Sequence, residues 1–161
     1  MNIFVTNKDP LKCAEFLDDK CVIKMILESA QMLSTAATLT GYQNELLYKP
    51  THKNHPCNVW VRESRENYNW LWNHFACLLM QYQIRFDKTH ACAKLFNILE
   101  NAGCFIPSKG PTPFVNCAAN KGLGIDFKNE PDVFEAYKKY LTLRWKHDKR
   151  KPTWKGKELN E

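Results

Sequence analysis

The sequence lacks several features that would each have assigned it to a familiar class of protein. None of its apolar runs is long enough to span a membrane, and it has no hydrophobic signal-peptide core. It also has no glycine-rich nucleotide-binding motif, no internal repeat and no CxxC pair among its seven cysteines. An odd number of irregularly spaced cysteines is typical of reduced, buried thiols. We therefore expect a soluble, intracellular protein without a membrane anchor.

The composition is that of a folded chain. The 161 residues are 44% apolar and 12% aromatic, which is enough to build one domain, 1–161, around a sizeable core. The helical spacing of the apolar residues predicts an all-α fold of about four or five helices, joined by long ordered loops. The helices are expected at 10–16, 18–39, 65–86, 91–102 and 131–145. The segment 104–129 is rich in proline and glycine and is expected to be a long loop, and loops of this length are often functional.

The helix expected at 18–39 combines an apolar stripe with a polar edge. Lys24 and Glu28 are four residues apart and share a face, with Cys21 and Gln31 three residues beyond either end of the pair. Such an edge is either a solvated surface or one wall of a catalytic site. The apolar residues recur at helical spacing and are expected to be buried: Val22, Ile23, Ile26, Leu27, Ala30 and Leu33.

Positive charge is concentrated near the C-terminus. The net charge is +6, and the segment 138–157 contains nine Lys and Arg residues against a single acid, Asp148. Aromatic rings interrupt this basic tail, 138–161, in a pattern that suits a polyanion whose bases can stack. We expect double-stranded DNA as the partner, although a solubilising tail is the alternative. The expected contacts in the tail are Arg150, Lys151 and Trp154.

A proline-bounded loop at 42–56 contains the densest polar cluster. Cationic side chains and loop amides suit phosphate contact, and the expected DNA-binding residues here are His52, Lys53, Asn54 and His55, followed by Trp60 and Arg62. Lys88 and His90 cluster beyond the end of the helix expected at 65–86 and are assigned to DNA as well. Two other interpretations stay open: an ordinary surface loop, or a metal site formed by His52, His55 and Cys57, with Cys21 as a further ligand.

The segment 19–28 resembles the first helix of the pyrimidine-dimer DNA glycosylase/AP-lyase family, the small phage endonuclease V type and its bacterial relatives. Glu28 matches the family's catalytic Glu, seven residues after Cys21, which takes the place of a His. The resemblance assigns Cys21 to DNA contact, together with Gln31, which stands at an Arg-rich position of the family's DNA-binding helix. The order of further motifs supports the resemblance, which spans about 9–90 and the tail: Lys53-Asn-His-Pro56 followed by Arg62, Gln81-Tyr-Gln-Ile-Arg85, and Pro152-Thr-Trp154.

The resemblance implies an amine that attacks the deoxyribose C1′ and expels the base, giving a Schiff base that undergoes β-elimination. Glu28 would stabilise the positive charge on the sugar. The family's nucleophile is the α-amine of a Thr exposed by removal of the initiator Met, whereas position 2 here is Asn. The candidate nucleophiles are therefore the α-amine of Met1, since α-amines titrate at about pH 8, and Lys24.

The resemblance predicts an N-glycosylase for damaged or modified pyrimidines, with AP-lyase activity if an amine attacks. The enzyme is expected to be a monomer without cofactor or metal, in the cytoplasm of a phage-infected bacterium. Three alternatives stay open: a base-modifying enzyme on the same scaffold, a non-catalytic phage protein that binds nucleic acid or a partner, and a metal-dependent hydrolase. If Met1 cannot serve, activated water would replace the amine.

Overall fold

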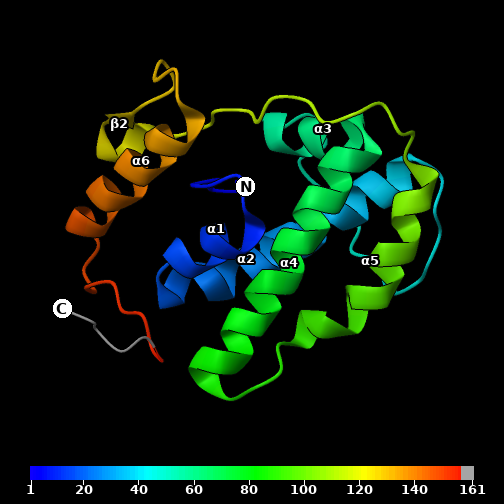
Figure 1. Cartoon of the computed structure of the whole chain (residues 1–161), viewed down its shortest axis with the longest axis horizontal. Helices are drawn as coiled ribbons and strands as arrows, with labels where there is room; N and C mark the ends of the chain where they lie inside the picture. Colours follow the sequence, from blue (N-terminus) through cyan, green and yellow to red (C-terminus); the bar gives the residue numbers. More distant parts are fainter. Residues whose placement is uncertain (157–161) are drawn as a thin grey trace.

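The computed structural model describes residues 1–156, and these residues form a helical fold with one very small sheet (Figure 1). The all-α prediction is therefore confirmed in outline, but the described residues contain six α-helices and not four or five. The helices are α1 (Pro10–Phe16), α2 (Asp19–Leu39), α3 (Pro56–Glu63), α4 (Arg65–Phe86), α5 (Phe96–Ala102) and α6 (Val133–His147). Short 3-10 turns join some of them, and strands β1 (Ala119–Asn120) and β2 (Ile125–Asp126) pair in antiparallel orientation.

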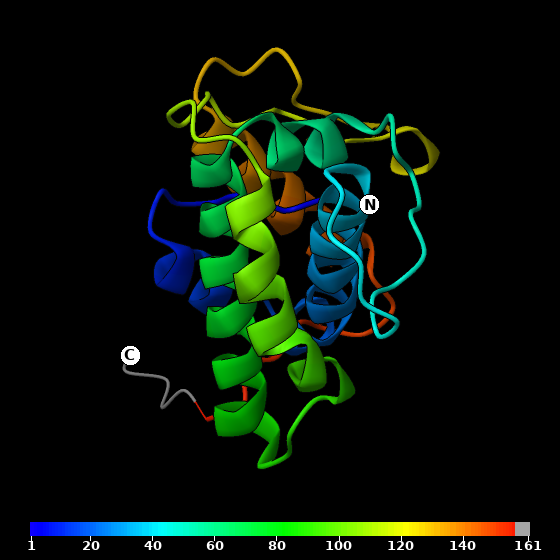
Figure 2. The same ribbon diagram turned by 90° about the vertical axis from the view of Figure 1, so that its right-hand side faces the viewer.

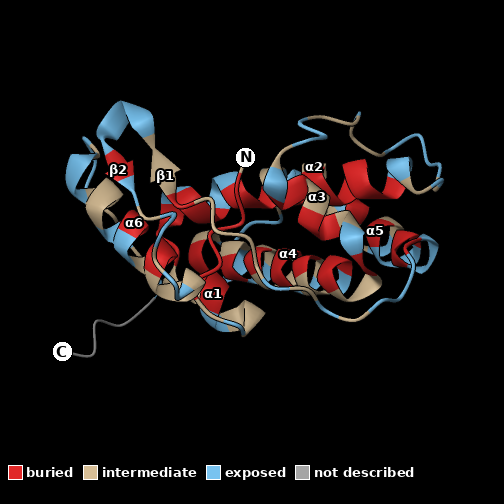
Figure 3. Cartoon of the chain, turned by 90° about the horizontal axis from the view of Figure 1, so that it is seen from above, coloured by how far each residue is buried: buried red, intermediate tan, exposed pale blue. Residues whose placement is uncertain are grey.

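The two longest helices, α2 and α4, form the centre of the molecule and lie side by side in both ribbon views (Figure 2). Together with α1, these helices carry about half of the buried residues (Figure 3). One part of the predicted stripe is wrong: Ile23 is 43% exposed and Leu27 is 40% exposed. The buried face of α2 is formed instead by residues that include Val22, Met25, Ile26 and Ser29. Ile23 and Leu27 therefore lie at the surface, next to the polar edge.

Local signals explain where the helices begin and end. Asp9 caps α1 by accepting a hydrogen bond from the Leu11 N–H at 2.9 Å, and Pro10 occupies the first helical position. Ser64 caps α4 in the same way. Gly41 follows the end of α2 with a φ of +101°, a conformation that glycine adopts without strain.

The segments predicted to be loops contain a further helix and the two strands of the sheet. His55 caps α3, whose first residue is Pro56, so this helix begins inside the polar loop and was not predicted. The long loop expected at 104–129 contains both strands of the sheet, and α6 begins at Val133 after the Asp132 cap.

The basic tail folds back onto the start of α2. The Thr153 hydroxyl donates to Asp19 Oδ2 at 2.7 Å, and the Lys155 N–H donates to Asp19 Oδ1 at 3.1 Å. Asp19 is buried and also pairs with the Arg85 guanidinium of α4, with Nη1 at 3.2 Å from Oδ1. The described part of the tail is thus an ordered element packed on the domain, while its end, 157–161, lies outside the described residues.

No helix within residues 1–156 combines the length and the apolar character that crossing a bilayer requires. The expected cytoplasmic location, single domain and monomeric state remain predictions.

Candidate active site

The Glu28 carboxylate is the meeting point of helix α2 and the N-terminal segment. Its Oε2 accepts a hydrogen bond from the Asn2 N–H at 3.0 Å and lies 3.9 Å from the α-amine of Met1. Its Oε1 lies 3.5 Å from Lys24 Nζ, one turn earlier on the same helix. The side chain of Glu28 is 13% exposed, so the carboxylate is largely enclosed but open on one side. Three residues that the sequence analysis named as catalytic are therefore brought together.

The N-terminal segment is held in place by the side chain of Asn2. Its Oδ1 accepts hydrogen bonds from the Ile3 N–H at 2.8 Å and from the Tyr137 hydroxyl at 2.8 Å, and its Nδ2 donates to the Cys117 carbonyl at 3.3 Å. Phe4 adopts a φ of +56°, unusual for a residue with a side chain, and stacks on Tyr140. The side chain of Asn2 thus fixes the N-terminal segment, and with it the amine, beside Glu28.

The polar loop reaches the same site through His55. Asn58, which is buried, donates to the carbonyls of Thr51 and His52 at 3.1 and 2.8 Å and so fixes the loop. His52 has a φ of +47° and its imidazole is exposed. The pKa of His55 is lowered, first by partial burial and then by the nearby N-terminal ammonium and by His52. His55 is therefore a neighbour of the amine, as its sequence position alone did not show.

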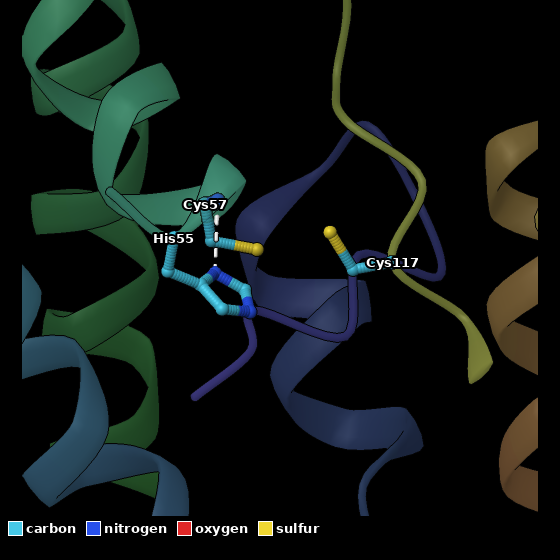
Figure 4. A group of neighbouring side chains, drawn as sticks. All are labelled: His55, Cys57 and Cys117. Carbon is cyan, nitrogen blue, oxygen red and sulfur yellow. Dashed lines mark hydrogen bonds between the residues drawn. The ribbon is translucent and has the colours of Figure 1, made fainter. Parts of the chain in front are cut away.

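Two thiols lie next to His55. Cys57, in the first turn of α3, is buried, and its Sγ lies 3.9 Å from Asn2 Oδ1. Cys117 comes from the loop before β1, and its sulfur faces that of Cys57 (Figure 4). The Cys57 thiol donates a hydrogen bond to the Cys117 sulfur, which lowers the pKa of Cys117 to about 7 and raises that of Cys57. Sequence reasoning missed Cys117, because 60 residues separate it from Cys57 and only the length of its loop indicated a function.

A groove of about 480 Å³ lies between the start of α2 and the tail. Lys24 lines it, so the groove adjoins the Glu28 site. Its walls combine two buried acids and the exposed Ile23 with five cations: Lys20, Lys24, Arg150, Lys151 and Lys155. Arg150 and Lys151 are exposed there, as DNA contact requires, whereas the two acids, Asp18 and Asp19, are engaged by Trp145 and by Arg85 and the tail.

Some expected DNA contacts have structural roles instead. Trp60 is 2% exposed and belongs to the core, which corrects its assignment as a surface contact. Cys21 is 6% exposed, so its side chain is withdrawn from the surface, and burial, followed by its hydrogen bond to Asp18, raises its pKa to about 12. Trp154 packs on Trp145 and donates to the Phe16 carbonyl at 3.1 Å, so it anchors the tail.

The remaining expected contacts are distributed over the surface. Lys53, Asn54 and Lys88 are exposed, and Gln31 is half-buried one turn after Glu28. His90 caps a 3-10 turn by accepting the Cys92 N–H at 3.1 Å. Arg62 is half-buried, and its buried Nη1 has no hydrogen-bond partner within residues 1–156. Their part in DNA binding stays a prediction.

The described residues thus form a small helical protein in which an amine and a carboxylate lie together beside a cationic groove. The chain belongs to the pyrimidine dimer DNA glycosylase family, whose model matches residues 1–94. The family resemblance of the sequence is therefore confirmed, and DNA is the substrate class that the family implies. No curated protein and no solved structure matches the chain. The family match includes Glu28, the N-terminal segment and the polar loop but ends before Cys117, Tyr137 and the tail.

Proposed function

We propose that the protein is a DNA N-glycosylase for damaged or modified pyrimidines, with Glu28 as its central carboxylate and the N-terminal α-amine as its nucleophile. One observation carries the proposal: the Met1 nitrogen lies 3.9 Å from Glu28 Oε2, in an N-terminal segment that Asn2 holds rigidly. An amine fixed beside a carboxylate is the pair of groups that base excision through a covalent intermediate needs.

The arrangement suggests an order of steps. The neutral amine forms a bond to the deoxyribose C1′ while the bond from C1′ to the base breaks, and the base leaves with that electron pair. Glu28 stabilises the positive charge that develops on the sugar and accepts the proton that the amine loses. The C1′–O4′ bond then breaks, the ring oxygen takes the proton held by Glu28, and the nitrogen lone pair completes the Schiff base. Glu28, again a carboxylate, accepts a C2′ proton while the C3′–O bond breaks, so the 3′ phosphate leaves with that electron pair and the strand is cleaved.

Met1 is a better candidate for the nucleophile than Lys24. The Lys24 side chain is 50% exposed, so no apolar pocket favours the neutral form that a nucleophile requires. The backbone nitrogen of Asn2 lies 3.0 Å from Glu28 Oε2, so removal of Met1 would leave a new α-amine next to the same carboxylate. The proposal therefore holds for either form of the N-terminus, and the intact mass of the protein tells which form is present.

The surroundings support a DNA substrate. The chemistry requires access to a sugar inside the duplex, which enzymes gain by kinking DNA or extruding a nucleotide. The cationic groove beside Lys24 can hold the phosphates on one side of Glu28, and His52 and Lys53 are exposed on the loop that carries His55. Ile23 and Leu27 add apolar contact surface between them.

Borohydride trapping tests the proposal directly. The protein is incubated with duplexes that contain a cyclobutane dimer, an abasic site or a hydroxymethylated pyrimidine, and with an undamaged control. We expect a covalent adduct that mass spectrometry assigns to the N-terminal residue. Glu28→Gln should lower the rate of base release by about 100-fold or more, since positioned acid–base groups contribute that much. Lys24→Met, which removes only a flanking cation, should retain the adduct.

Other results would separate the alternatives. An adduct on Lys24 would show that this side chain of α2 is the nucleophile. Base release that depends on Glu28 but gives no adduct would indicate that an activated water molecule is the nucleophile. Unchanged base release by Glu28→Gln would contradict the proposal. Salt-dependent DNA binding without base release on any substrate would leave the non-catalytic binding protein as the better description.

A further inference from the structure

We propose that His55, Cys57 and Cys117 form a binding site for a single zinc ion. Each residue offers one ligand atom, and these atoms all lie within 4.8 Å of one another. Figure 4 shows the two sulfurs facing each other, with the imidazole beside Cys57. Ligand atoms around tetrahedral zinc are a little under 4 Å apart, because each lies about 2.0 to 2.3 Å from the metal. The cluster needs only a small contraction to reach that geometry.

The three ligands come from elements that the fold already holds together. Cys57 belongs to the first turn of α3 and is 1% exposed. The backbone of Cys117 is fixed from both sides, since its N–H donates to the Tyr137 hydroxyl at 2.9 Å and its carbonyl accepts from Asn2 Nδ2 at 3.3 Å. A site that is assembled before the metal arrives needs little ordering on binding.

The chemistry of the donors selects the class of metal. Two cysteine sulfurs and one imidazole suit zinc and other thiophilic ions, whereas calcium and magnesium prefer oxygen ligands. Three protein ligands leave the fourth tetrahedral position for water, as in zinc sites with two Cys and one His. His52 and Cys21, which the sequence suggested as ligands, are not part of the cluster, and Cys117 replaces them.

Metal binding has a defined proton balance. Each cysteine that enters the site as a thiol releases its proton, and the zinc ion takes two thiolates and a neutral imidazole. His55 Nδ1 now accepts the Cys57 N–H at 3.1 Å, and ligation through either ring nitrogen would end that hydrogen bond. The hydrogen bond that the Cys57 thiol donates is lost as well when its proton leaves. These neutral hydrogen bonds are a small loss compared with two bonds from zinc to thiolate.

The proposal is independent of the glycosylase mechanism, because it concerns binding and not catalysis. The test uses the full chain, stripped of metal with a chelator and kept reduced. Cobalt(II), a spectroscopic substitute for zinc, is added first and zinc second. We expect one equivalent of cobalt to give the intense ultraviolet band of thiolate ligands and the visible bands of a tetrahedral site, and zinc to displace it. Cys117→Ser should weaken zinc binding by more than about 100-fold, since even indirect supporting residues contribute 10- to 100-fold.

Cys104→Ser is the matched control, because Cys104 is an exposed thiol outside the cluster and its loss should leave the titration unchanged. The His55→Ala variant should lose the tetrahedral bands while its circular dichroism stays helical. The absence of a one-to-one cobalt spectrum in the unmodified, reduced protein would overturn the proposal without any variant. It would also be overturned if Cys104→Ser weakened binding as much as Cys117→Ser. The proposal would also be overturned if the protein bound no metal and an added oxidant readily joined Cys57 and Cys117 in a disulfide bond, because the pair would then be a disulfide site.

Discussion

Replacing Asp19 by Asn tests the link between the core and the tail. The Asp19 carboxylate is buried and receives hydrogen bonds from three directions: Arg85 Nη1 at 3.2 Å, the Thr153 hydroxyl at 2.7 Å and the Lys155 N–H at 3.1 Å. The Arg85 side chain is only 1% exposed. Asn keeps the size and one oxygen acceptor but removes the charge, so the substitution takes away the carboxylate that pairs directly with the buried guanidinium, while the charges of Asp18 and Glu15 remain nearby.

The structure sets the expected magnitude. Removing one partner of a buried ion pair costs about 3 to 5 kcal/mol, because the other charge stays desolvated. Arg85 also donates to the Leu17 carbonyl at 2.7 Å and to Gln81 Oε1 at 3.1 Å, and these uncharged acceptors partly compensate. We therefore expect Asp19→Asn to lower the free energy of unfolding by about 3 kcal/mol. Its DNA affinity should fall as well, because Thr153 and Lys155 lose their anchor.

Urea unfolding followed by circular dichroism measures the change. Asp126→Asn is the matched control, because the Asp126–Lys128 pair is 3.9 Å apart with both side chains more than half exposed, and it should cost less than about 0.5 kcal/mol. Adding Arg85→Gln to Asp19→Asn should cost much less than the two single changes summed. The reasoning is refuted if Asp19→Asn costs no more than the control, or if the two changes are additive.

Three further predictions concern the core, the N-terminal segment and the groove. Burial lowers the pKa of His74 from 6.5 to about 4. Between pH 4 and pH 6.5, His74 is therefore protonated in the unfolded chain and neutral in the folded protein. The free energy of unfolding should therefore fall by about 3 kcal/mol as the pH drops from 6.5 to 4, and urea titrations of His74→Phe should show a smaller fall; parallel curves would contradict this. Tyr137→Phe removes a 2.8 Å hydrogen bond to Asn2 and should lower the rate of borohydride trapping more than DNA affinity, whereas equal losses would point to general destabilisation. Replacing Arg150 and Lys151 together by Gln should weaken DNA binding and reduce its salt slope by up to about 2, and an unchanged slope would remove both from the phosphate contacts.

The helices could be predicted because their signals are local. The Asp9-Pro10 step, the Ser64 cap and the Gly41 stop each act within a few residues, and the structure has α1, α2 and α4 at the expected places. Helix α3 was missed because its cap is a histidine within a loop rich in proline and asparagine, which the sequence rules read as irregular.

The site could be predicted only in part. Lys24 and Glu28 share a face by helix geometry alone. Asn2 and Tyr137 are 135 residues apart in the sequence, and no local sequence pattern predicts the hydrogen bond between them. Aromatic side chains were the least reliable guides, because Trp60 and Trp154 suit both a base-stacking surface and a packed interior. Only tertiary packing decides between them.

The hydrogen bonds between the tail and Asp19 also affect biosynthesis. A chain emerging from the ribosome exposes Asp19 and Arg85 before Thr153, so the first two can pair before the tail is made. Thr153 lies 134 residues after Asp19, and the wall that it and Lys155 add to the groove forms only after these residues have emerged. A nascent polypeptide that lacks them therefore has Glu28 and the amine but an incomplete groove, and we expect it to hold DNA weakly until they have emerged.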